Sequence, residues 1–180
     1  MSVNRRIVLL DTMAVAGTIA ASKHGGEWLS ENKKRWSDAI LSLSKTFGEK
    51  GCEFLVPTSV CYELMTLNED WKKLVLSESD SIFKYAKRAI SNDIMQLAAE
   101  YSYKSQTIES DDTKHKVKSF DPITAAYSLK YGYPIITENQ KDFVEPYFLI
   151  SEIKPVVVNI KKGKERRLLC LISPNKFTEL

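Results

Sequence analysis

Apolar residues recur along the chain with two different periods, and each period predicts a different kind of element. Short apolar runs that end at a proline or a polar residue predict buried strands. These runs lie at residues 7–11, 53–57 and 133–137. Apolar residues spaced three or four positions apart, together with capping residues, predict helices. The predicted helices cover residues 12–22, 27–47, 58–67, 79–103 and 121–132.

The segment "DPITAAYSLKYG" has the clearest start and stop signals of these helices. Asp121 suits the N-cap, Pro122 suits the first turn, and Gly132 suits the residue after the last turn. The preceding segment "SQTIESDDTKHKVKS", residues 105–119, is polar and predicts a loop.

Strands that alternate with helices predict an α/β fold. We expect a three-layer sandwich in which a mostly parallel sheet of about five strands is flanked by helices on both faces. The segments "PVVVNI" and "RLLCLIS", joined by the basic loop "KKGKER", predict a C-terminal antiparallel hairpin at about residues 155–173. A chain of 180 residues is long enough to bury a core, so we expect one domain over 1–180 with a helical extension at about 69–105.

The composition excludes few classes of protein, because the net charge is only +3 and 43% of the residues are hydrophobic, as in ordinary globular proteins. Basic clusters at residues 33–35, 114–118 and 161–167 either contact phosphates or form solvated surfaces. Three cysteines without metal-type spacing and only two histidines argue against a zinc site. The longest apolar run near the N-terminus is too short to span a bilayer. We therefore expect a cytoplasmic protein with no membrane partner.

Acidic residues are placed where the predicted strands end. Asp11 closes the first strand, Glu63 lies on the helix after the second, and Asp121 begins the helix that leads into the third. Glu138, Asn139 and Asp142 follow the third strand. In an α/β sheet, ligand sites collect outside the carboxyl ends of the strands. We therefore expect these side chains to meet at one edge of the sheet.

Most of these acids also have a purely structural explanation. Asp11 and Asp121 can cap the helices that begin beside them, and Asp142 can be an ordinary surface residue. Glu63 is harder to explain in this way, because the spacing of Val60, Leu64 and Leu67 places it on an apolar face. A carboxylate in such a position is costly unless it is paired or binds a metal ion.

Clustered carboxylates raise one another's pKa, and a divalent cation removes their repulsion. Ligands that are all oxygen favour Mg²⁺ or Mn²⁺ over zinc. A site of this kind suits the hydrolysis of phosphate esters. The sequence contains no phosphate-binding glycine loop, no nucleophile elbow and no histidine for a catalytic triad.

Four segments, in order, resemble the PIN-domain ribonucleases, a family that includes the toxins of many bacterial and archaeal toxin–antitoxin pairs. They are "IVLLDTMAVAG", "FLVPTSVCYELM", "FDPITAAYSLKYG" and "PIITENQKDF", and the tail "SPNKFTEL" is similar to the end of these proteins. The resemblance implies a PIN-like fold and a metal-dependent endoribonuclease. Asp11, Glu63 and Asp121 would then hold Mg²⁺ or Mn²⁺ and position the attacking water.

One position departs from the family pattern, because Asn139 stands where many members have an aspartate. Either Asn139 completes the site through its amide, or Asp142 supplies the missing carboxylate as a further catalytic and metal-binding residue. Thr12 and Thr137 are the supporting polar residues of the resemblance.

The resemblance implies RNA as the substrate, and an antitoxin protein and a homodimer as partners to consider. The expected contacts to the RNA backbone are Arg35, Lys114, Lys116 and Lys118. Two alternatives stay open. One is a catalytically weak or inactive PIN-like module that binds RNA or a protein. The other is a phosphatase or phosphoacceptor domain that uses Asp11, although Thr12 and Met13 supply no second aspartate.

Overall fold

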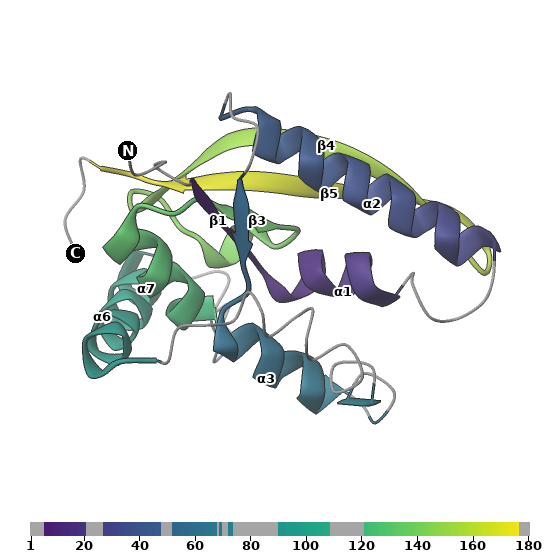
Figure 1. Cartoon of the computed structure of the whole chain (residues 1–180). Helices are drawn as coiled ribbons and strands as arrows, with labels where there is room; N and C mark the ends of the chain where they lie inside the picture. The colour runs from purple at the N-terminus through teal and green to yellow at the C-terminus, as the bar shows by residue number, and fades with distance from the viewer. Residues whose placement is uncertain are drawn as a thin grey trace, which may run out of the picture.

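A computed structural model describes residues 6–20, 27–47, 52–67, 69, 72–73, 90–108 and 121–176 of the chain (Figure 1). The strands are β1 (Ile7–Leu10), β2 (Glu53–Leu55), β3 (Ile135–Thr137), β4 (Phe148–Ile160) and β5 (Gly163–Pro174). The helices are α1 (Thr12–Ala20), α2 (Glu27–Lys45), α3 (Thr58–Leu67), α6 (Asn92–Ile108) and α7 (Asp121–Tyr131), with a short 3₁₀ helix η1 (Gln140–Asp142). The α/β class and a five-stranded sheet are therefore confirmed.

The five strands form one mixed sheet in the order β2-β1-β3-β5-β4. Strand β1 pairs in parallel with β2 and with β3. Strand β5 pairs antiparallel with β3 on one side and with β4 on the other. The sheet therefore has no parallel majority, because the last two strands form a hairpin that enters it beside β3. The predicted antiparallel hairpin is present.

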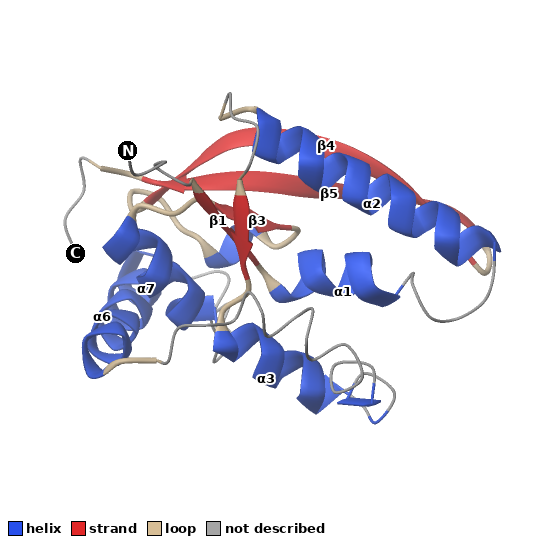
Figure 2. Cartoon of the chain, viewed as in Figure 1, coloured by secondary structure: helices blue, strands red, loops and turns tan. Residues whose placement is uncertain are grey.

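Alternate residues of the central strands face two separate cores, as the two-residue period of a strand requires. Val8, Leu10 and Ile136 belong to a core that includes residues of α1, α2 and α3. Leu9 and Ile135 belong to the other core, to which α6 and α7 contribute. The helices that supply the two cores lie in different regions around the sheet (Figure 2). Polar residues follow the carboxyl ends of β1 and β3, beyond the apolar residues that fill the two cores.

The predicted helix over residues 79–103 is confirmed over 92–103 and is wrong at 90–91. Ile90 and Ser91 are not helical, and α6 begins at Asn92. The Ser91 side chain hydrogen-bonds Asp93, and its carbonyl accepts the first helical bond from the amide of Met95. A serine with these contacts acts as an N-cap and starts a new helix. The predicted cap Ser79 lies outside the described residues.

The other end of α6 also differs from the prediction, because the helix continues to Ile108. It therefore includes the first residues of the segment 105–119, which the sequence predicts as a loop. Helices α3 and α7 are confirmed within one residue of their predicted bounds. Gly132 follows α7 with φ +71°, and its amide donates to the carbonyl of Ser128, as at a helix C-terminus.

The C-terminal hairpin is longer than the predicted 155–173. It starts at Phe148, turns at residues 161–162 and ends at Pro174. The register pairs Val157 with Arg166 and Asn159 with Lys164. Figure 1 shows α2 lying along this hairpin over much of its length.

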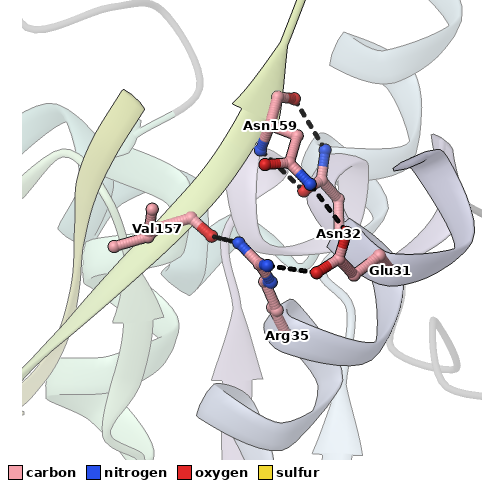
Figure 3. Close-up of polar contacts among 5 residues, drawn as sticks. All are labelled: Glu31, Asn32, Arg35, Val157 and Asn159. Atoms are coloured by element: carbon pink, nitrogen blue, oxygen red, sulfur yellow. Dashed lines mark hydrogen bonds and ion pairs between the residues drawn. The ribbon is translucent and has the colours of Figure 1, made fainter. Parts of the chain in front are cut away.

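Side chains of α2 hold the outer edge of β4, which is the edge strand of the sheet (Figure 3). The Asn32 amide donates to the Asn159 carbonyl at 2.8 Å and accepts from the Asn159 amide, also at 2.8 Å. Arg35 Nη1 donates to the Val157 carbonyl at 2.7 Å. These bonds satisfy backbone groups that an edge strand would otherwise expose to another chain. They also fix the hairpin against α2.

The helices that the structure describes include none that is long and apolar enough to cross a membrane.

Candidate active site

Asp11 lies directly after β1 and is almost fully buried. Its Oδ1 accepts a hydrogen bond from the Thr12 amide at 2.7 Å, and its Oδ2 accepts one from the Thr137 hydroxyl at 2.7 Å. Its carbonyl accepts the first bond of α1, from the amide of Val15. Asp11 therefore begins α1, and Thr137 of β3 also orients its carboxylate. The same residue can thus cap the helix and act in the candidate site.

Glu63 reaches the same place from α3. The Thr12 hydroxyl donates to Glu63 Oε2 at 2.6 Å, so one threonine contacts two of the predicted acids. Glu63 is half-buried, and Val60 and Leu64 beside it are fully buried, as predicted. Leu67 is 50% exposed, so the prediction that it shares this buried face is wrong. The apolar face of α3 is shorter because the helix ends at Leu67.

Asp142 is held by the segment that follows β3. The Asn139 side-chain amide donates to Asp142 Oδ2, and the Asn139 backbone amide donates to the Thr137 hydroxyl at 2.9 Å. Thr137 thus links Asn139 to Asp11. Asp142 is 6% exposed, so it is not a surface residue.

Tyr101 of α6 fixes the backbone around Asp142. Its hydroxyl donates to the Asp142 carbonyl at 2.8 Å and accepts from the Val144 amide at 3.0 Å. The tyrosine is fully buried. The sequence pattern places Tyr101 only on an apolar stripe and does not predict this role. A tyrosine at a buried position needs a hydrogen-bond partner for its hydroxyl, and this is the only sign of the role in the sequence.

Asp121 begins α7 and brings a carboxyl group that lacks a donor. It is 6% exposed, and its Oδ2 is buried without a hydrogen-bond partner among the described residues. Burial, together with the charges of Asp11 and Asp142, raises the pKa of Asp121 to about 9. A hydrogen bond with the Asp142 side chain also favours the protonated form. Metal-free Asp121 is therefore neutral at pH 7.

Asp11 is affected in the same way. Burial raises the pKa of Asp11 to about 6 against the opposing effect of the bonds from Thr137 and Thr12. The charges of Glu63 and Asp142 add to the increase. Four acidic side chains from four segments of the chain are thus close enough to influence one another.

Glu138 is a fifth acid at this edge, where its position after the third strand predicts it, although it is not among the predicted metal ligands. It follows β3, its side chain is 15% exposed, and its Oε1 is buried without a donor among the described residues. Arg167 of β5 approaches Glu138 Oε2 at 3.7 Å. Burial raises the pKa of Glu138, and Arg167 opposes this increase.

The expected RNA contacts do not gather at these acids in the described part of the chain. Arg35 donates to Val157 and pairs with Glu31, and these bonds place it in the contact between α2 and β4. Lys114, Lys116 and Lys118 lie outside the described residues.

As placed, the described histidine, cysteine, aspartate and glutamate side chains form no group of three or more that could hold a metal ion. Hydrogen bonds to neighbours account for part of this arrangement, because Thr12 holds Glu63 and Asn139 holds Asp142. The chemistry of the donors nevertheless suits a hard cation. All are oxygen atoms, and two of them, Asp121 Oδ2 and Glu138 Oε1, are buried without a donor among the described residues. Burial opposes the negative charge of both side chains.

No family model matches the chain, and neither a curated protein nor a solved structure matches it.

Proposed function

We propose that the chain is a PIN-like, Mg²⁺- or Mn²⁺-dependent endoribonuclease. One observation supports this proposal above the others. Asp11, Glu63, Asp121 and Asp142 come from four separate segments and influence one another in one mostly buried cluster. Burying several acids together destabilises a fold, and such clusters are typical of functional sites.

Asp11, Glu63 and Asp121 would hold the cation, with Asp142 as the fourth carboxylate. When bound, the cation lowers the pKa of a coordinated water and neutralises charge on the phosphate. Thr12 and Thr137 orient the carboxylates, Thr12 through its contacts with Asp11 and Glu63, and Thr137 through Asp11. Asp121 and Asp11 would lose their protons on loading, because a metal ligand must be deprotonated.

The structure also suggests how the departure at Asn139 is accommodated. Its amide donates to Asp142 and so presents a carboxylate beside Asp121 and Asp11. We therefore propose that Asp142 supplies the charge and that Asn139 positions it. The antitoxin partner and the homodimer stay predictions of the resemblance.

The second candidate is a PIN-like module that binds RNA or a protein without cutting RNA. Two observations favour it: the neutral amide at Asn139, and the absence among the described residues of three side chains already arranged around a metal position. This candidate predicts RNA binding that is the same with and without a divalent cation.

Incubation of the purified chain with a mixture of structured and single-stranded RNAs distinguishes the two candidates. We expect fragments to appear with Mn²⁺, to disappear with EDTA, and to return when excess Mn²⁺ is added. RNA that stays intact in all three conditions, while it binds the protein, would favour the non-catalytic module.

A further inference from the structure

The tip of the β4–β5 hairpin, residues 161–167, carries a larger net positive charge than the whole chain. Residues 161–167 contain five basic residues and one acid, a net charge of +4, whereas the whole chain carries +3. The remaining 173 residues are therefore net −1. The net positive charge of the chain is thus concentrated on one hairpin.

The basic residues at the tip are exposed and not neutralised by neighbours. Lys161, Lys162, Lys164 and Arg166 are all exposed, and within the described ranges none of them forms an ion pair. Arg167 differs, because it contacts Glu138 at 3.7 Å and Glu165 at 3.5 Å. Four cations without an ion-pair partner among the described residues therefore extend beyond Arg167, which is anchored at Glu138.

The geometry of β5 connects these cations to the candidate active site. Cys170 pairs with Thr137, whose hydroxyl donates to Asp11, so β5 passes directly beside the site. From there the strand runs back to the turn at Gly163, about 25 Å away at the rise of an extended strand. Lys164 and Arg166 occupy alternate positions on one face, about 7 Å apart. This spacing is on the scale of one nucleotide.

A second basic cluster lies beside the hairpin tip. The Asn32 side chain bonds the backbone of Asn159 (Figure 3). Asn159 pairs with Lys164 across the hairpin. Lys33 and Lys34 directly follow Asn32 on α2, and Lys34 is exposed. Two of the three basic clusters in the sequence therefore converge at the same end of the molecule.

We infer that the β4–β5 hairpin is an arm that binds the phosphate backbone of single-stranded RNA and leads it to the acidic cluster. Exposed apolar residues lie on the same face as Lys164 and Arg166, among them Val157 and Leu168, and they offer contact area for sugars and bases. The bonds from Asn32 and Arg35 keep the arm against α2, so little ordering is required when RNA binds. This inference rests on the proposed function for the identity of the nucleic acid.

Fluorescence anisotropy with a labelled single-stranded RNA of 20 nucleotides, in EDTA, tests the arm without cleavage. The arm variant carries Lys161→Gln, Lys162→Gln, Lys164→Gln and Arg166→Gln. The control variant loses the same charge at exposed or half-exposed lysines elsewhere, with Lys45→Gln, Lys104→Gln, Lys130→Gln and Lys176→Gln. Urea unfolding of both variants checks that the fold is kept.

We expect the arm variant to bind at least about tenfold more weakly at 50 mM salt, because four phosphate contacts are lost. The slope of log K against log salt should become shallower by about 3, at roughly 0.7 per phosphate of a single strand. The control variant should stay within about twofold of the unmodified chain. Equal losses in both variants, or no loss in the arm variant, would overturn the inference.

Two further probes exclude other polyanions. Polyglutamate stands for an acidic protein partner, and phosphatidylserine vesicles stand for a membrane surface. An arm variant that keeps RNA binding but loses binding to either probe would overturn the assignment to RNA. The cleavage assay tests the proposed nuclease activity separately from the RNA-binding arm. If the unmodified chain cleaves RNA and the arm variant binds RNA normally, only the inference about the arm is refuted. If the unmodified chain does not cleave RNA but its RNA binding depends on the arm, only the proposed nuclease activity is refuted.

Discussion

Replacing Asp11 by asparagine is expected to lower the rate of Mn²⁺-dependent RNA cleavage by roughly 100- to 1,000-fold. Losses of this size are typical when one charged or polar group that stabilises the reacting centre is removed. Asp11 is the acid with the most defined position, because Thr12 and Thr137 each donate to one of its oxygens. The substitution removes the negative charge and retains the size of the side chain.

The fold should tolerate this change. Asparagine keeps one oxygen to accept from the Thr12 amide, and its amide group can donate to the Thr137 hydroxyl, which can rotate to accept. Asp38→Asn is the matched control, because Asp38 is an exposed carboxylate on α2. The measurement is the initial cleavage rate of a labelled RNA by the three proteins, with urea unfolding alongside. If Asp11→Asn and Asp38→Asn cleave at the same rate, Asp11 has no part in the chemistry.

Replacing Asp121 by asparagine should stabilise the metal-free protein at alkaline pH by roughly 2 kcal/mol, because a buried acid that resists ionisation is removed. In the folded chain, burial raises the pKa of Asp121 to about 9, from an ordinary value of 3.8 for an aspartate in water. Between these values the folded state holds a proton that the unfolded state has lost. The free energy of unfolding of the unmodified chain therefore falls as pH rises from about 4 to about 9.

Asp11 contributes to the same trend over a narrower range, because its pKa in the folded protein is about 6. The Asp121→Asn variant should keep a smaller decline, to which Asp11 contributes up to about pH 6 and Glu138 adds because burial also raises its pKa. Urea unfolding in EDTA at pH 5, 7 and 8.5 measures the difference. We expect the two proteins to be closest in stability at pH 5 and furthest apart at pH 8.5. A free energy of unfolding that is constant or rises with pH in the unmodified chain would contradict the burial of an acid at this position.

Local sequence signals predict the elements that surround the site. Helix α7 is predicted because Asp121, Pro122 and Gly132 mark both of its ends. Helix α3 is predicted because Thr58 or Ser59 suits a helix cap. The spacing of apolar residues does not show where α6 begins, because the same spacing continues on both sides of the N-cap Ser91. Only the bonds of Ser91 to Asp93 and Met95 show that a helix begins there.

Pairing between distant strands is less accessible to sequence reasoning. A short apolar run predicts a strand, but neither its direction nor its neighbour, because these depend on contacts far along the chain. Strand β5 therefore enters beside β3 in the antiparallel direction, and the expected parallel majority is not found. The same limit applies to Arg35, whose charge suggests a phosphate contact but which bonds the backbone of β4 instead.

The sequence predicts the acids of the candidate site that end a strand or begin a helix. It predicts the polar residues that orient those acids less well. Asp11, Glu63 and Asp121 can be found because each interrupts an apolar pattern or begins a helix. The second contact of Thr12, the bridge made by Thr137 and the role of Tyr101 depend on side-chain geometry that no spacing encodes.

Calorimetric titration with Mn²⁺ at pH 7.5 tests most directly whether the clustered acids form a cation site. The unmodified chain should give a saturable heat that varies with the ionisation enthalpy of the buffer, because Asp121 releases a proton on binding. The Asp11→Asn/Asp121→Asn double variant should give only the heat of dilution. If the unmodified chain produces no more heat than the double variant, the acids do not bind the cation and the proposed chemistry is refuted.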